Sequence, residues 1–261
     1  MIIKDSEVVD LQTPTGPMRT YIFRPVAGGK YPALILFSEI FQVTGPIRRT
    51  AAMLAGHGYI VAVPEVYHEL EPRGSVIPYD GGGADRGNAH KITKELSAYD
   101  ADARALIDHL QSRTDCTGKL GCAGICLGGH LSFRCAMNPE ILAATCFYGT
   151  DIHKRGLGKG KNDNSLDRIP EIKAELLMIW GRQDPHIPME GRQLIYNTLS
   201  TAGTTFTWHE FNGQHAFLRD EGPRYDPELA RTCHGLALGL FHRKLGQGDL
   251  STATGTTESR H

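Results

Sequence analysis

Residues 121–130 read Gly-Cys-Ala-Gly-Ile-Cys-Leu-Gly-Gly-His, and they lead directly into an apolar, helix-like run over residues 131–137. A short apolar strand that ends in Gly-x-Cys-x-Gly-Gly before a helix is typical of a nucleophile elbow. In such a turn the central residue is held in a strained conformation, and glycines stand where side chains would collide with backbone. Cys126 takes the central position, where the N-terminus of the helix favours a thiolate and a developing oxyanion. A glycine-rich turn with an ordinary buried cysteine would carry the same motif.

Apolar runs alternate with amphipathic segments along most of the chain, after an opening hairpin at residues 8–11 and 18–23. This alternation predicts an α/β fold with a mostly parallel central sheet and helices on both faces. We expect one domain over residues 1–245 and a disordered Ser/Thr/Gly-rich tail over residues 246–261. The expected strands are 31–37, 59–64, 120–126, 143–149, 174–181 and 204–211, and the expected helices are 46–58, 99–110, 189–199 and 227–244. The Pro- and Gly-rich stretch 65–88 is expected to be an irregular functional loop.

Three residues suited to nucleophilic catalysis each follow an expected strand. Cys126 ends one strand, Asp184 follows the strand that ends at residue 181, and His215 follows the strand that ends at residue 211. In a parallel sheet these strand ends share one edge, where ligands bind. The order nucleophile, acid, histidine is that of α/β-hydrolases. His215 would accept the thiol proton and Asp184 would orient the imidazole.

Each of the two partner residues also has a structural interpretation. Asp184 precedes a proline and could simply cap a loop. His186, two residues beyond Asp184, could compete with His215 as the partner of the aspartate. The joint occurrence of the three residues after three strands favours the catalytic interpretation.

These motifs resemble the dienelactone hydrolase (carboxymethylenebutenolidase) family, which uses a cysteine on the α/β-hydrolase fold. The likeness covers residues 21–244 and rests on four short segments. These are residues 124–129, 181–184, 215–217 and 39–41. The resemblance implies a hydrolase of aromatic catabolism with a Cys126–Asp184–His215 triad and no cofactor.

The resemblance also assigns roles around the nucleophile. Glu39 would hold the resting thiol and move away when substrate binds, and the main-chain N–H groups of Ile40 and Leu127 would form the oxyanion hole. A carboxylate beside a thiol keeps that thiol protonated and protects it from oxidation. Glu39 could alternatively cap the adjacent helix.

The family's substrate, a small unsaturated lactone with a carboxylate, is bound by arginines. Arg219 and Arg86 match those positions, and a guanidinium suits a planar carboxylate well. Either arginine could instead form a surface salt bridge. The sequence departs from the family in two places: His90 stands where a tyrosine helps to bind the carboxylate, and the polar insertion at residues 151–168 is longer.

Composition excludes several other functional classes. The 261 residues carry a formal net charge of −1, which gives no indication of a nucleic-acid or acidic-membrane partner. No apolar run approaches membrane-spanning length, and the histidines lack a metal-ligand spacing, so we expect no membrane partner and no metal. Six cysteines without a leader segment indicate free thiols in a reducing compartment. We therefore expect a cytoplasmic monomer whose partner is a small anionic lactone or ester.

The expected reaction opens a carboxylate-bearing enol-lactone through a thioester on Cys126. A thiolate expels a stabilised enolate easily, whereas simple alkyl esters leave less readily. Two alternatives remain: a broader thiol-dependent esterase of activated esters, and a non-enzymatic redox-sensing or binding protein on the same fold.

Overall fold

A computed structural model describes residues 1–246 and shows one eight-stranded mixed sheet with the strand order β1-β2-β4-β3-β5-β6-β7-β8. Apart from Gly246, the predicted disordered tail lies outside the described residues. The strands are β1 (Ile3–Thr13), β2 (Gly16–Pro25), β3 (Tyr31–Phe37), β4 (Ile60–Pro64), β5 (Cys116–Ile125), β6 (Ile141–Phe147), β7 (Glu175–Gly181) and β8 (Phe206–Phe211). The helices are α1 (Gly45–Gly56), α2 (Gly81–Thr93), α3 (Leu96–Ser112), α4 (Leu127–Cys135), α5 (Met189–Thr201) and α6 (Pro227–Leu245), with a 3₁₀ turn at Ile169–Glu171.

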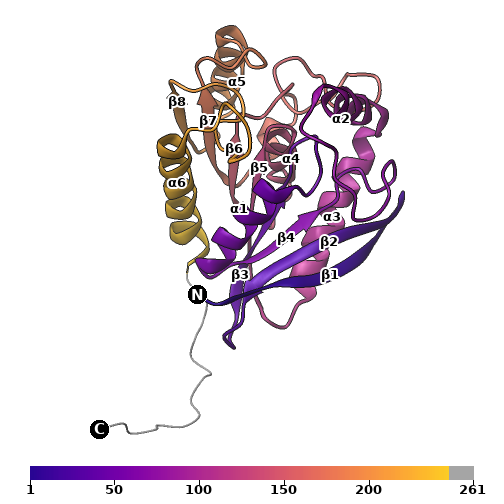
Figure 1. Cartoon of the computed structure of the whole chain (residues 1–261). Helices are drawn as coiled ribbons and strands as arrows, with labels where there is room; N and C mark the ends of the chain where they lie inside the picture. Colours follow the sequence, from indigo (N-terminus) through magenta and orange to yellow (C-terminus); the bar gives the residue numbers. More distant parts are fainter. Residues whose placement is uncertain (247–261) are drawn as a thin grey trace, which may run out of the picture.

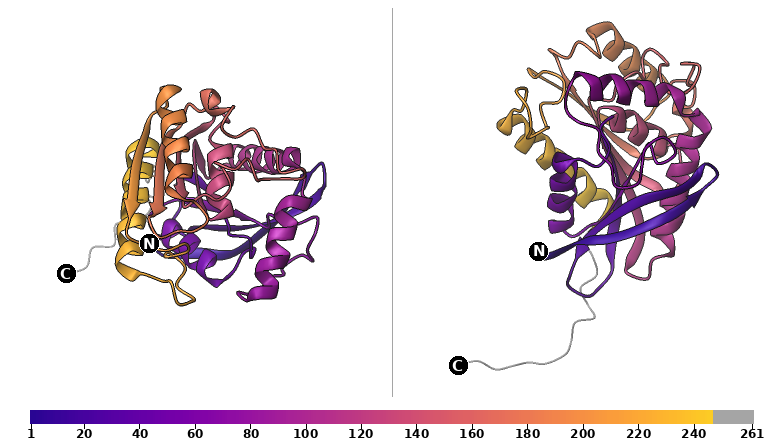
Figure 2. Two further views of the ribbon diagram at one scale, coloured as in Figure 1. Left: turned by 90° about the horizontal axis from the view of Figure 1, so that it is seen from above. Right: turned by 45° about the vertical axis from the view of Figure 1, so that its right-hand side comes forward.

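The sheet is parallel from β4 through β8, and only β1 and β2 run antiparallel to their neighbours. Every residue of β3 and β4 is buried, as expected for strands covered on both faces. Helices α1 and α6 lie against one face, and α3 and α4 pack together against the other (Figures 1 and 2). The predicted α/β architecture is therefore confirmed. None of the helices in residues 1–246 is long and apolar enough to cross a bilayer.

The register of the sheet brings the functional segments to one edge. Phe37 at the end of β3 pairs with Gly124 in β5, and the ends of β7 and β8 pair through Gly181 and Phe211. The loops that follow these four strands carry Glu39, Cys126, Asp184 and His215. Parallel pairing thus gathers residues that are up to 176 positions apart in the sequence, from 39 to 215.

The prediction of an irregular loop through residues 65–88 was wrong in its second half, where α2 begins at Gly81 (Figure 1). The side chain of Asp80 caps this helix by accepting from the N–H of Gly83 at 2.7 Å. Glycine normally disfavours a helix, but here it allows close packing. A Cβ on Gly83 would lie 2.0 Å from the carbonyl oxygen of Pro78, and one on Gly87 would lie 2.5 Å from that of Ile40.

The 151–168 insertion is packed onto the domain by buried groups. His130 on α4 lies between the carbonyl oxygen of Thr150, 2.8 Å from its Nδ1, and the hydroxyl of Ser165, 2.8 Å from its Nε2. Asp163 is fully buried, with its carboxylate 3.4 Å from the His130 ring. Leu157 is also fully buried. These contacts hold Thr150, just before the insertion, and residues 163 and 165, near its end, against α4.

His234 on α6 provides a test of how the core responds to pH. Burial lowers the pKa of His234 to about 4, and its ring lies edge-on to that of Phe147. The unfolded chain binds the proton at about pH 6.5, so the stability from neutral His234 is complete above that pH and is lost as pH falls toward 4. By linkage, the wild-type protein should lose about 2–3 kcal/mol more than His234→Gln between pH 7.5 and 4.5. Urea unfolding of both proteins measures this difference, and equal losses would contradict it.

Candidate active site

Cys126 joins β5 to α4 in a strained backbone conformation. Its φ of 60° and ψ of −117° lie outside the regions that side-chain-bearing residues usually occupy. Its N–H donates to the carbonyl of Phe147 at 3.1 Å, and its carbonyl accepts from the N–H groups of Gly129 at 2.9 Å and Thr150 at 3.3 Å. These hydrogen bonds keep the Cys126 backbone in its strained conformation. All six cysteines are buried free thiols, but Cys126 alone among them lines the cavity described below.

The glycines of the motif are required by close backbone contacts. A Cβ on Gly124 would lie 1.8 Å from the carbonyl oxygen of Gly128, and one on Gly128 would lie 2.1 Å from that of Phe37. A Cβ on Gly129 would lie 2.7 Å from Cα of Gly149. The start of α4 therefore presses against both neighbouring strand ends, which is the packing that a nucleophile elbow needs.

Asp184 pairs with His215. The Nδ1 of His215 lies 2.6 Å from Oδ2 of Asp184, and both side chains are buried. The other carboxylate oxygen, Oδ1, accepts from the main-chain N–H of His186 at 2.8 Å. The ring of His186 instead lies edge-on to that of His215, with centroids 4.7 Å apart. His186 thus orients the aspartate through its backbone and does not compete for it.

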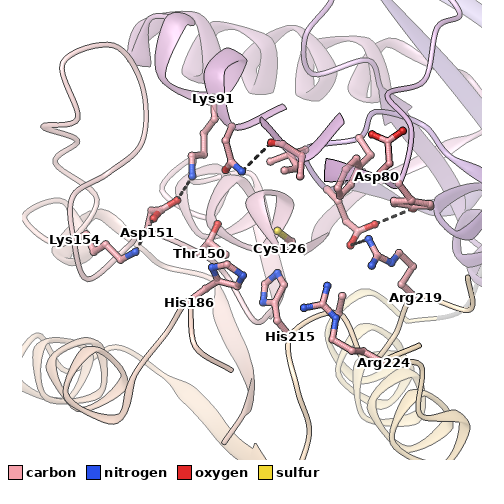
Figure 3. Close-up of a pocket in the computed structure, with 17 residues that line it drawn as sticks. Asp80, Lys91, Cys126, Thr150, Asp151, Lys154, His186, His215, Arg219 and Arg224 are labelled. Atoms are coloured by element: carbon pink, nitrogen blue, oxygen red, sulfur yellow. Dashed lines mark hydrogen bonds and ion pairs between the residues drawn. The ribbon is translucent and has the colours of Figure 1, made fainter. Parts of the chain in front are cut away.

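Electrostatics at His215 favour its charged form. Burial by itself lowers the pKa of His215, but the charge of a Cys126 thiolate and the hydrogen bond to Asp184 outweigh it and raise the pKa to about 10. An imidazolium flanked by two anions is the arrangement that stabilises a thiolate–imidazolium pair. Figure 3 shows His215 beside the sulfur of Cys126.

Glu39 is buried beside the same cavity. Its Oε2 accepts from the hydroxyl of Tyr79 at 3.0 Å, and its Oε1 lies 4.0 Å from Nη1 of Arg219. Burial raises the pKa of Glu39, although the positive charge of Arg219 and the Tyr79 hydrogen bond act in the opposite direction. Among the described residues, the hydrogen-bond partner of the Glu39 carboxyl is thus Tyr79, and the thiol of Cys126 is not one.

The two amides expected to form an oxyanion hole lie near the thiol. Leu127 is the first residue of α4, and the first N–H groups of a helix have no partner within it. Ile40 follows Glu39 in the loop after β3 and lines the cavity that contains Cys126. The helix dipole of α4 adds positive potential at the same place.

These residues enclose a cavity of about 430 Å³ at the carboxyl edge of the sheet. Cys126 and His215 lie at its centre, with Lys91, Asp151 and Lys154 on one side and Arg219 and Arg224 on the other (Figure 3). The lining residues are Glu39, Ile40, Phe41, Tyr79, Asp80, Ala84, Asn88, Lys91, Cys126, Thr150, Asp151, Lys154, His186, His215, Ala216, Arg219 and Arg224. The volume suits a small organic substrate.

The three expected substrate-binding residues are not together. Arg219 lines the cavity, with its guanidinium carbon 4.3 Å from the centre of the Tyr79 ring. Arg86 and His90, in contrast, both bind the buried carboxylate of Glu71, at 2.6 Å each, and neither is among the cavity-lining residues. Glu71 carries no motif, so this competing partner could not be predicted from the sequence.

The sequence-based reasoning missed several cavity residues. Tyr79 and Asp80 lie in the loop before α2, which was expected to be irregular. Lys91 follows His90 and forms a 2.5 Å ion pair with Asp151. Arg224 lies beyond Arg219 in a loop without a recognisable motif.

Comparison with known proteins identifies the family. The model of the dienelactone hydrolase family matches residues 18–245. The chain belongs to the dienelactone hydrolase family. A Saccharomyces cerevisiae protein provisionally named a carboxymethylenebutenolidase is 43% identical over 249 residues, which is 90% of each chain. Membership of the dienelactone hydrolase family identifies the chain as a hydrolase.

Further matches extend this result. The carboxymethylenebutenolidase of Pseudomonas putida is 29% identical over 197 residues, covering 74% of this chain and 78% of its own. The crystal structure of a Klebsiella pneumoniae protein, provisionally named a dienelactone hydrolase, superposes with a TM-score of 0.81 at 24% identity, covering 93% of this chain and 100% of its own. That structure supports the fold of the dienelactone hydrolase family across nearly the whole chain.

Proposed function

We propose that this member of the dienelactone hydrolase family opens a small carboxylate-bearing enol-lactone through a thioester on Cys126. The observation that carries the proposal is the hydrogen-bonded Asp184–His215 pair beside a strained cysteine at the base of a small cavity. A nucleophile, a base and a residue that orients the base are the components of covalent acyl transfer. The names of the relatives support the lactone as substrate class.

In the acylation step, the thiolate of Cys126 attacks the lactone carbonyl carbon while His215 carries the proton taken from the thiol. The carbonyl oxygen becomes an oxyanion that accepts from the N–H groups of Leu127 and Ile40. The C–O bond of the ring then breaks, and the ring oxygen leaves as an enolate. The enolate takes the proton that His215 carries and becomes a ketone, which leaves His215 neutral for the next step. Since the enolate is a good leaving group, a cysteine suffices.

In the deacylation step, His215 removes a proton from water, and the resulting hydroxide attacks the thioester carbonyl carbon. The C–S bond breaks, the acid is released as its carboxylate, and Cys126 returns as the thiolate. Asp184 holds Nδ1 of His215 throughout, so that Nε2 faces the reacting atoms. Without this orientation the imidazole could not serve both steps.

Glu39 and Arg219 would couple catalysis to the charge of the substrate. A substrate carboxylate that binds Arg219 competes with Glu39 for the same guanidinium, which lies 4.0 Å from Glu39 Oε1. Release of Glu39 from this contact leaves its carboxyl free to move, as the family resemblance implies. Because the site is buried, the attraction between the Arg219 guanidinium and either carboxylate is stronger than it would be in water.

The test is the ultraviolet decay of dienelactone with the purified protein, run beside a neutral aryl ester. Fast lactone turnover with slow ester cleavage is the expected result. Ester cleavage without lactone turnover would contradict the proposed substrate but retain the cysteine chemistry of a broader esterase. If neither compound reacts and peroxide reversibly modifies Cys126, the enzymatic proposal is wrong and a redox-sensing role takes its place.

A further inference from the structure

In the loop between His215 and α6, the acidic residues 220 and 221 and the arginines lie on different sides, the acidic pair against α1 and the arginines at the cavity. Asp220 and Glu221 both accept from the guanidinium of Arg49 on α1, at distances between 2.6 and 2.7 Å. Arg219 and Arg224, from the same loop, line the cavity instead. The negative charges of the loop are thus neutralised away from the cavity, and its positive charges face the cavity.

The loop that carries Arg224 is closed at its base. The N–H of Asp226 donates to the carbonyl of Phe217 at 3.0 Å, and the Asp226 carboxylate caps α6 by accepting from Leu229 at 3.0 Å. The N–H of Arg219 donates to Ala216 at 3.1 Å. These contacts fix Arg219 directly and close the loop just beyond Arg224, at Asp226.

Arg224 differs from the other cavity-lining cations in its pairing. Within residues 1–246 no carboxylate lies within ion-pair distance of its guanidinium, whereas Lys91 and Lys154 both contact Asp151, at 2.5 and 3.5 Å. The positive charge of Arg224 is close enough to Glu39 to act on that carboxyl. Arg224 therefore supplies a guanidinium without a carboxylate partner among the described residues, on the same side of Cys126 as Arg219 (Figure 3).

Arg86, which the family resemblance assigns to the substrate, is occupied elsewhere. Its Nε lies 2.6 Å from Oε1 of Glu71, and its Nη2 lies 2.6 Å from Oε2, which is a bidentate pair. The Glu71 side chain is 2% exposed, so breaking the pair would leave a buried carboxylate with His90 alone. Arg86 is thus bound to Glu71, and a substrate carboxylate could bind Arg86 only by breaking this ion pair.

We propose that Arg224, and not Arg86, acts with Arg219 as the pair of guanidinium groups that holds the substrate carboxylate. This inference rests on the proposed function for the presence of that carboxylate. Two guanidinium groups on one short loop can donate to both carboxylate oxygens while the carbonyl carbon lies near Cys126. Arg224 is then a specificity-determining residue of this chain.

The experiment compares two aryl esters with the same leaving group, 4-nitrophenyl hydrogen succinate and the neutral 4-nitrophenyl pentanoate. The ratio of their kcat/KM values on one enzyme preparation is independent of the amount of active protein. Arg224→Gln is expected to lower this ratio roughly tenfold to a hundredfold, mainly through KM for the succinate ester, because one charge-assisted hydrogen bond is lost. Arg224→Lys keeps the charge without the bidentate geometry, so its kcat/KM ratio should lie between those of the wild type and Arg224→Gln.

Arg86→Gln and Lys91→Gln are the matched comparisons. The ratio should change less than about twofold in each, since an arginine bound to Glu71 and a lysine on the opposite side hold no substrate carboxylate. A lowered ratio in Arg86→Gln, or an unchanged ratio in Arg224→Gln, would overturn the inference. A lowered ratio in Lys91→Gln would overturn it by placing the carboxylate beside Asp151.

A binding measurement separates this inference from the proposed function. Calorimetry of the unreactive anilide of succinic acid with Cys126→Ala needs no turnover. The Arg224→Gln change in that background should weaken binding by the same factor as it lowers the ratio, and an equal affinity would overturn the assignment. The aryl esters and the anilide do not involve a lactone, so failure of the lactone assay leaves this test intact.

Discussion

Replacement of Cys126 by alanine is expected to lower kcat for both the lactone and an aryl ester by about 10⁴-fold or more, since removal of a nucleophile leaves only binding and the oxyanion hole. Circular dichroism and the urea midpoint should remain close to those of the wild type, because the side chain is small and lies at a cavity wall. Steady-state kinetics on matched preparations measure the effect.

Cys233→Ala is the control for that prediction. Cys233 is a fully buried thiol on α6 outside the cavity, so its removal should leave kcat unchanged apart from some loss of stability. Turnover by Cys126→Ala at the wild-type rate would exclude a covalent cysteine mechanism. Equal inactivation of both variants would show that the loss comes from folding and not from chemistry.

Gly128→Ala is expected to destabilise the fold strongly. The added Cβ would lie 2.1 Å from the carbonyl oxygen and 2.6 Å from the carbonyl carbon of Phe37. Phe37 ends β3, which is paired on both sides, so the strand cannot move aside. The free energy of unfolding should fall by about 4 kcal/mol or more, at the upper end for a single substitution.

Gly239→Ala is the matched control for Gly128→Ala. Gly239 lies within α6, and a Cβ there would meet no atom within 4 Å. This change should stabilise the protein by about 0.5–1 kcal/mol, because alanine favours the helix more than glycine does. Urea denaturation of both variants gives the comparison. A Gly128→Ala protein as stable as the wild type would show that the elbow can relax.

The sequence was sufficient to predict the sheet and the residues at its edge. Short continuous apolar runs such as residues 31–37 are typical of strands in a sheet covered on both faces, and parallel pairing then determines which loops meet. This is why Cys126, Asp184 and His215 could be selected from positions far apart in the sequence. The choice between His186 and His215 needed the structure, because it depends on which atom of each residue faces Asp184.

Other features could not be predicted because they arise from long-range packing. The glycines near the start of α2 are typical of an irregular loop. In the structure they let the helix pack closely against Pro78 and Ile40, a contact that the sequence pattern does not reveal. The pairing of Arg86 with Glu71 joins two residues of the stretch that the sequence predicts to be an irregular functional loop. Arg224 carries no motif, and its place at the cavity goes with the pairing of Asp220 and Glu221 with Arg49 on the other side of the loop.

The central claim is a thioester on Cys126, and trapping the acyl-enzyme tests it most directly. The protein is mixed with 4-nitrophenyl pentanoate, quenched in acid within the first turnover and analysed by mass spectrometry. We expect the peptide that contains Cys126 to carry a pentanoyl group in place of its thiol hydrogen, and this group should be sensitive to hydroxylamine and absent from Cys126→Ala. An acyl group on another residue, or one that persists in Cys126→Ala, would contradict a thioester on Cys126.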